Sequence, residues 1–143
     1  MALLNYTTKI EPEQTIAEIQ RLLAKHGVSA MMTEYDGPHV AAVSFRINVE
    51  GNPIGFKLPC NWRAVLEVIN ADRKIRHGYK TNDQAIRTAG RIIFEWVRTQ
   101  LALVEVNMVR VPQVFLPYAI MRDGKTLSEH VERDPSLLLG LSK

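Results

Sequence analysis

The chain has 143 residues, 46% of them hydrophobic, which is enough to bury a core in one compact domain. Its single cysteine excludes an internal disulfide, and no apolar run is long enough to span a bilayer, so we expect a soluble cytoplasmic protein without a membrane partner. The net charge of +3 is mild but concentrated, because residues 61–110 hold nine Lys or Arg against five Asp or Glu. This excess favours an anionic partner, although it falls short of a dedicated nucleic-acid coat.

The first part of the chain predicts a helix followed by a three-stranded sheet. Residues 12–26 have apolar side chains at helical spacing, with Pro12 in the first turn and Gly27 as the stop. The apolar period then shortens from about 3.6 residues to about 2 in "SAMMTEY", "HVAAVSFRINV" and "PIGFKL". Turn-forming residues separate these runs, so we expect an antiparallel meander. One face should be apolar and packed on helices, and the other should show Ser44, Arg46, Asn48 and Lys57.

Two helices and a C-terminal extension are predicted after the sheet. "NWRAVLEVINAD" has one apolar side, and Thr81 with Gln84 forms a capping-box pattern before a long helix from about residue 82 to about residue 108. The apolar "VRVPQVFLPYAIM" contains two prolines, which predicts broken helix or extended chain over the core. "TLSE" predicts a second capping box and a short helix that Pro135 ends, and "SLLLGLSK" predicts a docked tail or a partner contact.

These elements give an α+β fold of order α-β-β-β-α-α in a single domain, residues 1–143. Residues 111–143 are expected to form a C-terminal extension that packs on the core or makes oligomer or partner contacts.

The strongest candidate for an anion site is "RKIRHGYKTNDQAIRTAGR", residues 73–91, which carries six Lys or Arg and one carboxylate. Its first part is a connector that offers Arg73, Lys74, Arg76, His77 and Lys80 directly before a helix N-terminus. Free N–H groups and the helix dipole favour anions at such a position. The alternative is an ordinary polar loop between two helices.

A second group of cations lies on the long helix itself. Arg87, Arg91 and Arg98 align opposite the apolar arc, with Phe94 among them. They would extend the connector into a track that grips phosphates and stacks a base, as in sequence-tolerant binding of single strands, or they form only a solvated helix face. Arg46 and Lys57 would add contacts if the open sheet face adjoins this track.

No pattern in the sequence predicts catalysis, a metal site or a cofactor. The glycines form no phosphate-cradling loop motif, and the four histidines are scattered. Cys60 fits a small buried side chain better than a nucleophile, and Glu34 and Glu95 lack a partner for acid–base catalysis.

Six blocks within residues 5–128 resemble one family: "NYTTKI", "TEYDG", "AVSFRI", "FKLPCN", "RIIFEWVRTQLALVE" and "VFLPY". This is a widespread family of short, uncharacterised proteins encoded by bacteriophages, prophages and other mobile elements. It has no activity that can be carried over to these residues. The resemblance implies a mobile-element protein in the cytoplasm of a bacterial host cell, with nucleic-acid handling or interference with host defence as its function.

The element order also resembles that of double-stranded-RNA-binding domains, which contact RNA through the first helix, the first strand-connecting loop and a basic start of the last helix. Here the loop is the acidic "YDGP", and the helix after the sheet begins "NWRAVLE". Both departures argue against duplex RNA as the ligand.

Two functional hypotheses follow. The first is a non-catalytic accessory protein that binds nucleic acid, preferably single strands, through the connector and the helix face. The second is an interaction protein, such as an anti-defence inhibitor of a host protein or a binder of a nucleotide signal. In that case "VFLPYAIM" and "SLLLGL" would supply the surface for a homo-oligomer or a partner.

Overall fold

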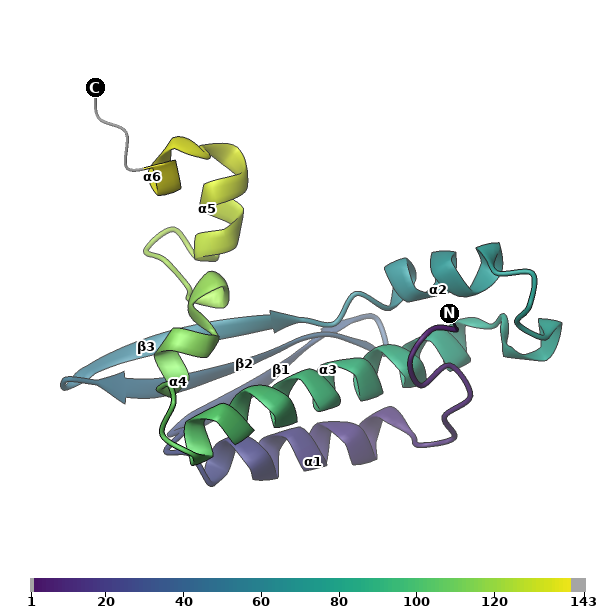
Figure 1. Ribbon diagram of the computed structural model, residues 1–143, viewed down its shortest axis with the longest axis horizontal. Helices are drawn as coiled ribbons and strands as arrows, with labels where there is room; N and C mark the ends of the chain where they lie inside the picture. Colours follow the sequence, from purple (N-terminus) through teal and green to yellow (C-terminus); the bar gives the residue numbers. More distant parts are fainter. Residues whose placement is uncertain (1, 140–143) are drawn as a thin grey trace.

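A three-stranded antiparallel sheet organises the fold, with helices before and after it in the chain (Figure 1). The computed structural model describes residues 2–139. The main elements are α1 (Pro12–Ala24), β1 (Ala30–Asp36), β2 (His39–Val49), β3 (Asn52–Pro59), α2 (Trp62–Ala71) and α3 (Asn82–Glu105). The shorter ones are the 3₁₀ turns η1 (His77–Tyr79) and η2 (Leu116–Tyr118) and the helices α4 (Val111–Val114), α5 (Leu127–Arg133) and α6 (Ser136–Leu139). The predicted α+β order is confirmed.

The two faces of the sheet differ as the alternation predicts. Phe45 pairs with Phe56 and both are buried on the face that α1 and α3 cover (Figure 1). The neighbouring pair, Ser44 and Lys57, therefore points to the opposite face. The expectation that Ser44 is exposed is wrong, since it is only 7% exposed. Its place in the central strand lets the longer neighbouring side chains cover it, and its hydroxyl donates to Glu34.

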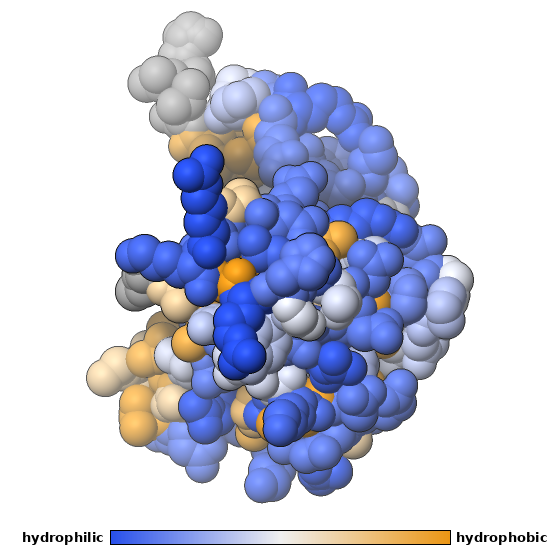
Figure 2. Space-filling model, turned by 90° about the vertical axis from the view of Figure 1, so that its right-hand side faces the viewer, coloured by the Kyte–Doolittle hydropathy of each residue, from blue (hydrophilic) through white to orange (hydrophobic). Residues whose placement is uncertain are grey.

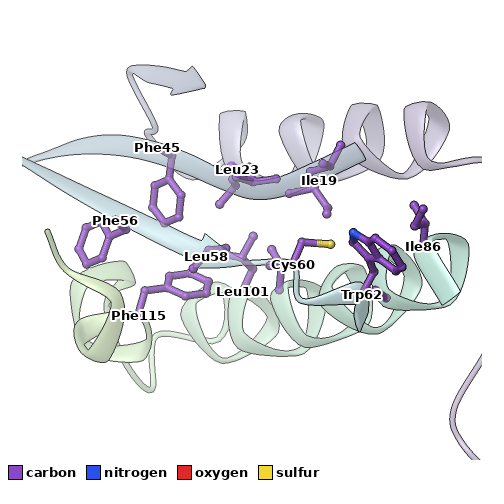
Figure 3. Packing of buried hydrophobic residues seen from close by; sticks show 14 of the residues in the cluster. Ile19, Leu23, Phe45, Phe56, Leu58, Cys60, Trp62, Ile86, Leu101 and Phe115 are labelled. Atoms are coloured by element: carbon purple, nitrogen blue, oxygen red, sulfur yellow. The ribbon is translucent and has the colours of Figure 1, made fainter. Parts of the chain in front are cut away.

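The core lies between the sheet and the helices (Figure 3). The Phe45 ring stacks on Phe56 with centroids 5.2 Å apart and meets Phe115 edge-on at 5.5 Å. Phe115 is fully buried, so the proline-interrupted segment after α3 packs into the core rather than over a free surface. The segment then runs along β3, where the Ile120 N–H donates to the Gly55 carbonyl at 2.8 Å.

α1 and α3 run in the same direction beneath the sheet (Figure 1). They approach closely at Gly90, where a Cβ atom would lie 3.3 Å from Cγ2 of Thr15. The crossing therefore fixes which residues of α3 face α1.

Local signals set the ends of the helices. α3 ends at Glu105, three residues before the predicted boundary, because Asn107 adopts a left-handed φ of 62°. The second capping box is confirmed: Thr126 accepts from the Glu129 N–H, and the Glu129 carboxylate accepts from the Thr126 N–H. α5 ends at Arg133, before Pro135.

The predicted tail, residues 136–143, begins as the short helix α6, and its last four residues lie outside the described part of the chain. Among residues 2–139, no helix is long and apolar enough to cross a membrane.

Candidate nucleic-acid interface

The connector between α2 and α3 is a loop held in one shape by its own contacts. Ile75 is 3% exposed and anchors the middle of the loop in the core. Asp72 fixes the entry, because its carbonyl accepts from the Ile75 N–H at 3.2 Å and its carboxylate from the Lys74 N–H at 2.9 Å. Tyr79 packs edge-on against Tyr6, with ring centroids 5.6 Å apart. The side chains between these anchors therefore project from a firmly positioned backbone.

Three connector cations are free within the described residues. Arg73, Lys74 and Arg76 are exposed, and none of them has a side-chain hydrogen bond or an ion pair in residues 2–139. His77 is also exposed, whereas Lys80 is partly buried and its Nζ donates to the Asn70 carbonyl at 3.4 Å. The connector lies at one end of the molecule (Figure 1), and the view onto that end is mostly hydrophilic (Figure 2).

The start of α3 binds the N-terminal segment of the chain. The Thr81 hydroxyl caps the helix by accepting from the Gln84 N–H at 3.1 Å. The reciprocal half of the predicted capping box is absent from the described contacts, because the Gln84 side-chain oxygen accepts from the Arg87 guanidinium at 2.9 and 3.1 Å. The Gln84 amide nitrogen donates to the carbonyls of Tyr6 and Thr8. Asp83 supplies a negative charge to the first turn and offsets part of the helix dipole. Any anion would therefore be held by the connector side chains more than by the helix terminus.

Arg87 and Arg91 point toward α1 and are neutralised there. Arg87 lies 3.3 Å from Glu11, and Arg91 lies 2.5 Å from Glu18. The Arg91 guanidinium also donates to the Thr15 hydroxyl at 3.2 Å. Because α1 supplies a carboxylate to each of them, these two arginines join α1 to α3 rather than forming a free phosphate track.

The remaining predicted cations, Arg98, Lys57 and Arg46, lie away from the connector. Arg98 is exposed but stands about 24 Å along α3 from its first residue. Phe94 is covered by arginines, with the Cζ atoms of Arg91 and Arg98 at 4.3 and 5.7 Å from its ring centre. Lys57 pairs with Glu34 at 3.6 Å on the outer sheet face, where Arg46 is also exposed. The structure thus divides the predicted set among the connector, the α1–α3 seam and the outer sheet face.

Cys60 and Glu95, the side chains considered for catalysis, make contacts that hold the fold together. Burial raises the pKa of Cys60 to about 11, so the thiol stays neutral near pH 7, and its interpretation as a buried side chain is confirmed. Glu95 accepts a hydrogen bond from the Asn5 amide at 3.2 Å and so helps to hold the N-terminal segment. Within residues 2–139, no group of three or more His, Cys, Asp or Glu side chains is placed to hold a metal ion.

A groove of about 440 Å³, which no sequence pattern predicted, lies between α1, the β1–β2 turn and the start of α3. Its rim carries the carboxylates of Glu11, Glu13 and Asp83, together with Arg87. No motif marks these residues, which come from three separate elements. The acidic first turns of two helices were visible in the sequence, but their proximity depends on the parallel packing of α1 and α3.

Comparisons with protein-family models, curated proteins and solved structures give no match. The fold and the connector define an α+β protein that presents a firmly held cationic loop. This loop is the feature that best indicates a function.

Proposed function

We propose that the protein binds nucleic acid through the connector and catalyses no reaction. The observation that supports this is that Arg73, Lys74 and Arg76 are exposed and form no ion pair among the described residues. Neighbouring cations repel one another, and a phosphate backbone relieves that repulsion while releasing its own counterions. Because Ile75 and Asp72 fix the loop, binding requires little further ordering of its backbone.

Single-stranded nucleic acid is the preferred ligand. A duplex that spanned this end of the molecule would meet Glu11, Glu13 and Asp83 around the groove at the start of α3. These carboxylates repel phosphates, whereas a single strand can follow the connector alone. Three phosphate contacts predict that log K falls with log salt with a slope of about −2 on single strands.

Fluorescence anisotropy with labelled oligo-dT, oligo-rU and a duplex, each at several salt concentrations, tests the proposal. The variant Arg73→Glu/Arg76→Glu should lose at least about tenfold in affinity for single strands and flatten the salt dependence. Arg122→Glu/Arg133→Glu is a matched control, since it also reverses two exposed arginines but on the C-terminal part of the chain. The absence of binding to all three probes at low salt, or equal losses in the connector variant and the control, would refute the proposal.

The second candidate is an interaction protein, an anti-defence inhibitor or nucleotide-signal binder, and exposed apolar side chains favour it. Leu116, Ile120, Met121, Leu137 and Leu138 are exposed in the C-terminal part of the chain. Such side chains often mark a partner or oligomer surface. Truncation after Arg133 removes α6, and light scattering then reports the oligomeric state. If the truncated and full chains have the same number of subunits in solution, α6 does not mediate a homo-oligomer.

The mobile-element setting that the sequence blocks imply suits both functions. Nucleic-acid handling and interference with a host protein are both expected of a protein encoded by such an element.

A further inference from the structure

The free edge of β1 is the first of two features that point to a second ligand. β1 is an outer strand of the sheet, and within residues 2–139 its backbone hydrogen bonds are those of its ladder with β2. The opposite edge differs, because β3 is already bonded by Ile120. β1 contains no Lys or Pro, two residues that commonly protect an edge from pairing, and its ladder with β2 is regular from Ala30 to Glu34 before the register shifts at Tyr35. Its outward N–H and C=O groups are therefore available to another strand.

The groove is the second feature, and it lies beside the end of β1. One side of α1 lines it with residues at helical spacing, Glu13, Ile16, Ala17 and Gln20. β1 contributes Tyr35, which is 62% exposed, and the β1–β2 turn contributes Pro38. An edge strand beside a helix-lined groove is the arrangement used in β-strand addition. The edge bonds the backbone of an extended peptide, and the groove receives alternate side chains.

The charge of the groove favours a peptide with basic side chains. Of its three carboxylates, Glu11 is paired with Arg87, whereas Glu13 and Asp83 have no ion-pair partner among the described residues. Ile16 and Ala17 offer an apolar floor between these charges. A lysine or arginine side chain fits both properties, because its alkyl stem packs on apolar surface while its head pairs with a carboxylate. A phosphate backbone would be repelled at the same place.

We propose that the β1 edge and the adjoining groove bind an extended, positively charged peptide segment of a partner protein. The segment pairs with β1 as a further strand, and its basic side chains reach Glu13 and Asp83. This site is separate from the connector, so it adds a protein partner to the proposed nucleic-acid binding and does not depend on it.

The probe is a short fluorescein-labelled peptide of alternating valine and lysine, titrated into the full chain at low salt. Two control peptides separate the contributions: one has an N-methyl group at every backbone nitrogen, and the other has glutamate in place of lysine. The first cannot complete the strand ladder and the second reverses the charge. We expect both to bind at least about tenfold more weakly than the parent peptide.

Protein variants locate the site. Glu13→Gln/Asp83→Asn should weaken the parent peptide at least about fivefold, and Ala17→Trp should do the same by filling the groove. Glu67→Gln/Glu132→Gln removes two exposed carboxylates from other elements and should leave binding unchanged. Amide NMR shifts on peptide addition should concentrate on residues 30–36, and circular dichroism confirms that each variant is folded.

The proposal is overturned if the parent peptide does not bind, or if the N-methylated peptide binds equally well. It is also overturned if the groove variants behave like the Glu67→Gln/Glu132→Gln control. A titration with oligo-dT that shifts the same β1 amides would assign the site to nucleic acid instead and refute a peptide site.

Discussion

Replacing Arg91 with methionine should destabilise the fold by about 2 kcal/mol and leave oligonucleotide affinity unchanged. The Arg91 and Glu18 side chains are 12% and 25% exposed, so their ion pair lies between a surface pair and a buried one. Surface pairs contribute about 0–1 kcal/mol, whereas breaking a buried pair costs about 3–5 kcal/mol. Methionine keeps the alkyl stem beside Phe94, so most of the loss comes from leaving Glu18 without its cation.

Urea unfolding followed by circular dichroism measures this loss. With an m value of about 2 kcal/mol/M, a loss of about 2 kcal/mol lowers the midpoint by about 1 M. A double-mutant cycle with Glu18→Gln isolates the pair, and we expect a coupling free energy of about 1–2 kcal/mol. Arg98→Met is the control for removing an exposed arginine from the same helix, and it should change the midpoint little.

Anisotropy measurements on the same variants decide between a structural and a binding role for Arg91. If Arg91→Met left the urea midpoint unchanged and weakened oligo-dT binding as much as the connector variant does, Arg91 would be a phosphate ligand. The division of the arginines between the connector and the α1–α3 seam would then be wrong.

Three further predictions concern stability and reactivity. Gly90→Leu should cost about 1–3 kcal/mol in thermal or urea unfolding, because the added side chain would collide with Thr15. Cys60 should resist iodoacetamide at pH 8 until the protein unfolds, since burial raises its pKa to about 11; rapid labelling of the native protein in a mass spectrum would contradict this. Hydrogen bonds from the backbone and side chain of Thr126 lower the pKa of Glu129, so the α5 cap should be intact above the usual carboxyl range and lost as pH falls through the lowered pKa. A Thr126 amide NMR shift that does not change on acidification would contradict that prediction.

The fold was largely predictable because its signals are local. The change of apolar period after Gly27 separates helix from sheet, and the turn residues between the strands set a meander. Thr126 and Glu129 form both hydrogen bonds of their capping box within four residues, so that cap could be predicted directly from the sequence. Gln84 shows the limit of local signals: the reciprocal half of that cap does not form, because the Gln84 side-chain oxygen accepts from Arg87 and its amide nitrogen donates to Tyr6 and Thr8, which are far away in sequence.

The site was predictable only in part, for the same reason. Helical periodicity places Arg87 and Arg91 opposite the apolar arc of α3, but it does not reveal what lies beside that side of the helix. Their partners, Glu11 and Glu18, come into reach only because α1 packs parallel to α3. The acidic groove depends on the same packing, since its residues belong to elements that are distant in sequence.

The distribution of charge at the connector end of the molecule connects the two proposed ligands. Arg87, near the start of α3, has a carboxylate partner, whereas Arg73 and Arg76 have none among the described residues. The connector leads into the first turn of α3, where Asp83 lines the acidic groove, so surfaces of opposite sign adjoin. A phosphate backbone is attracted to one surface and repelled by the other, and a basic peptide has the opposite preference. We therefore expect the two proposed ligands to bind the same end of the protein together, and we expect salt to weaken both interactions.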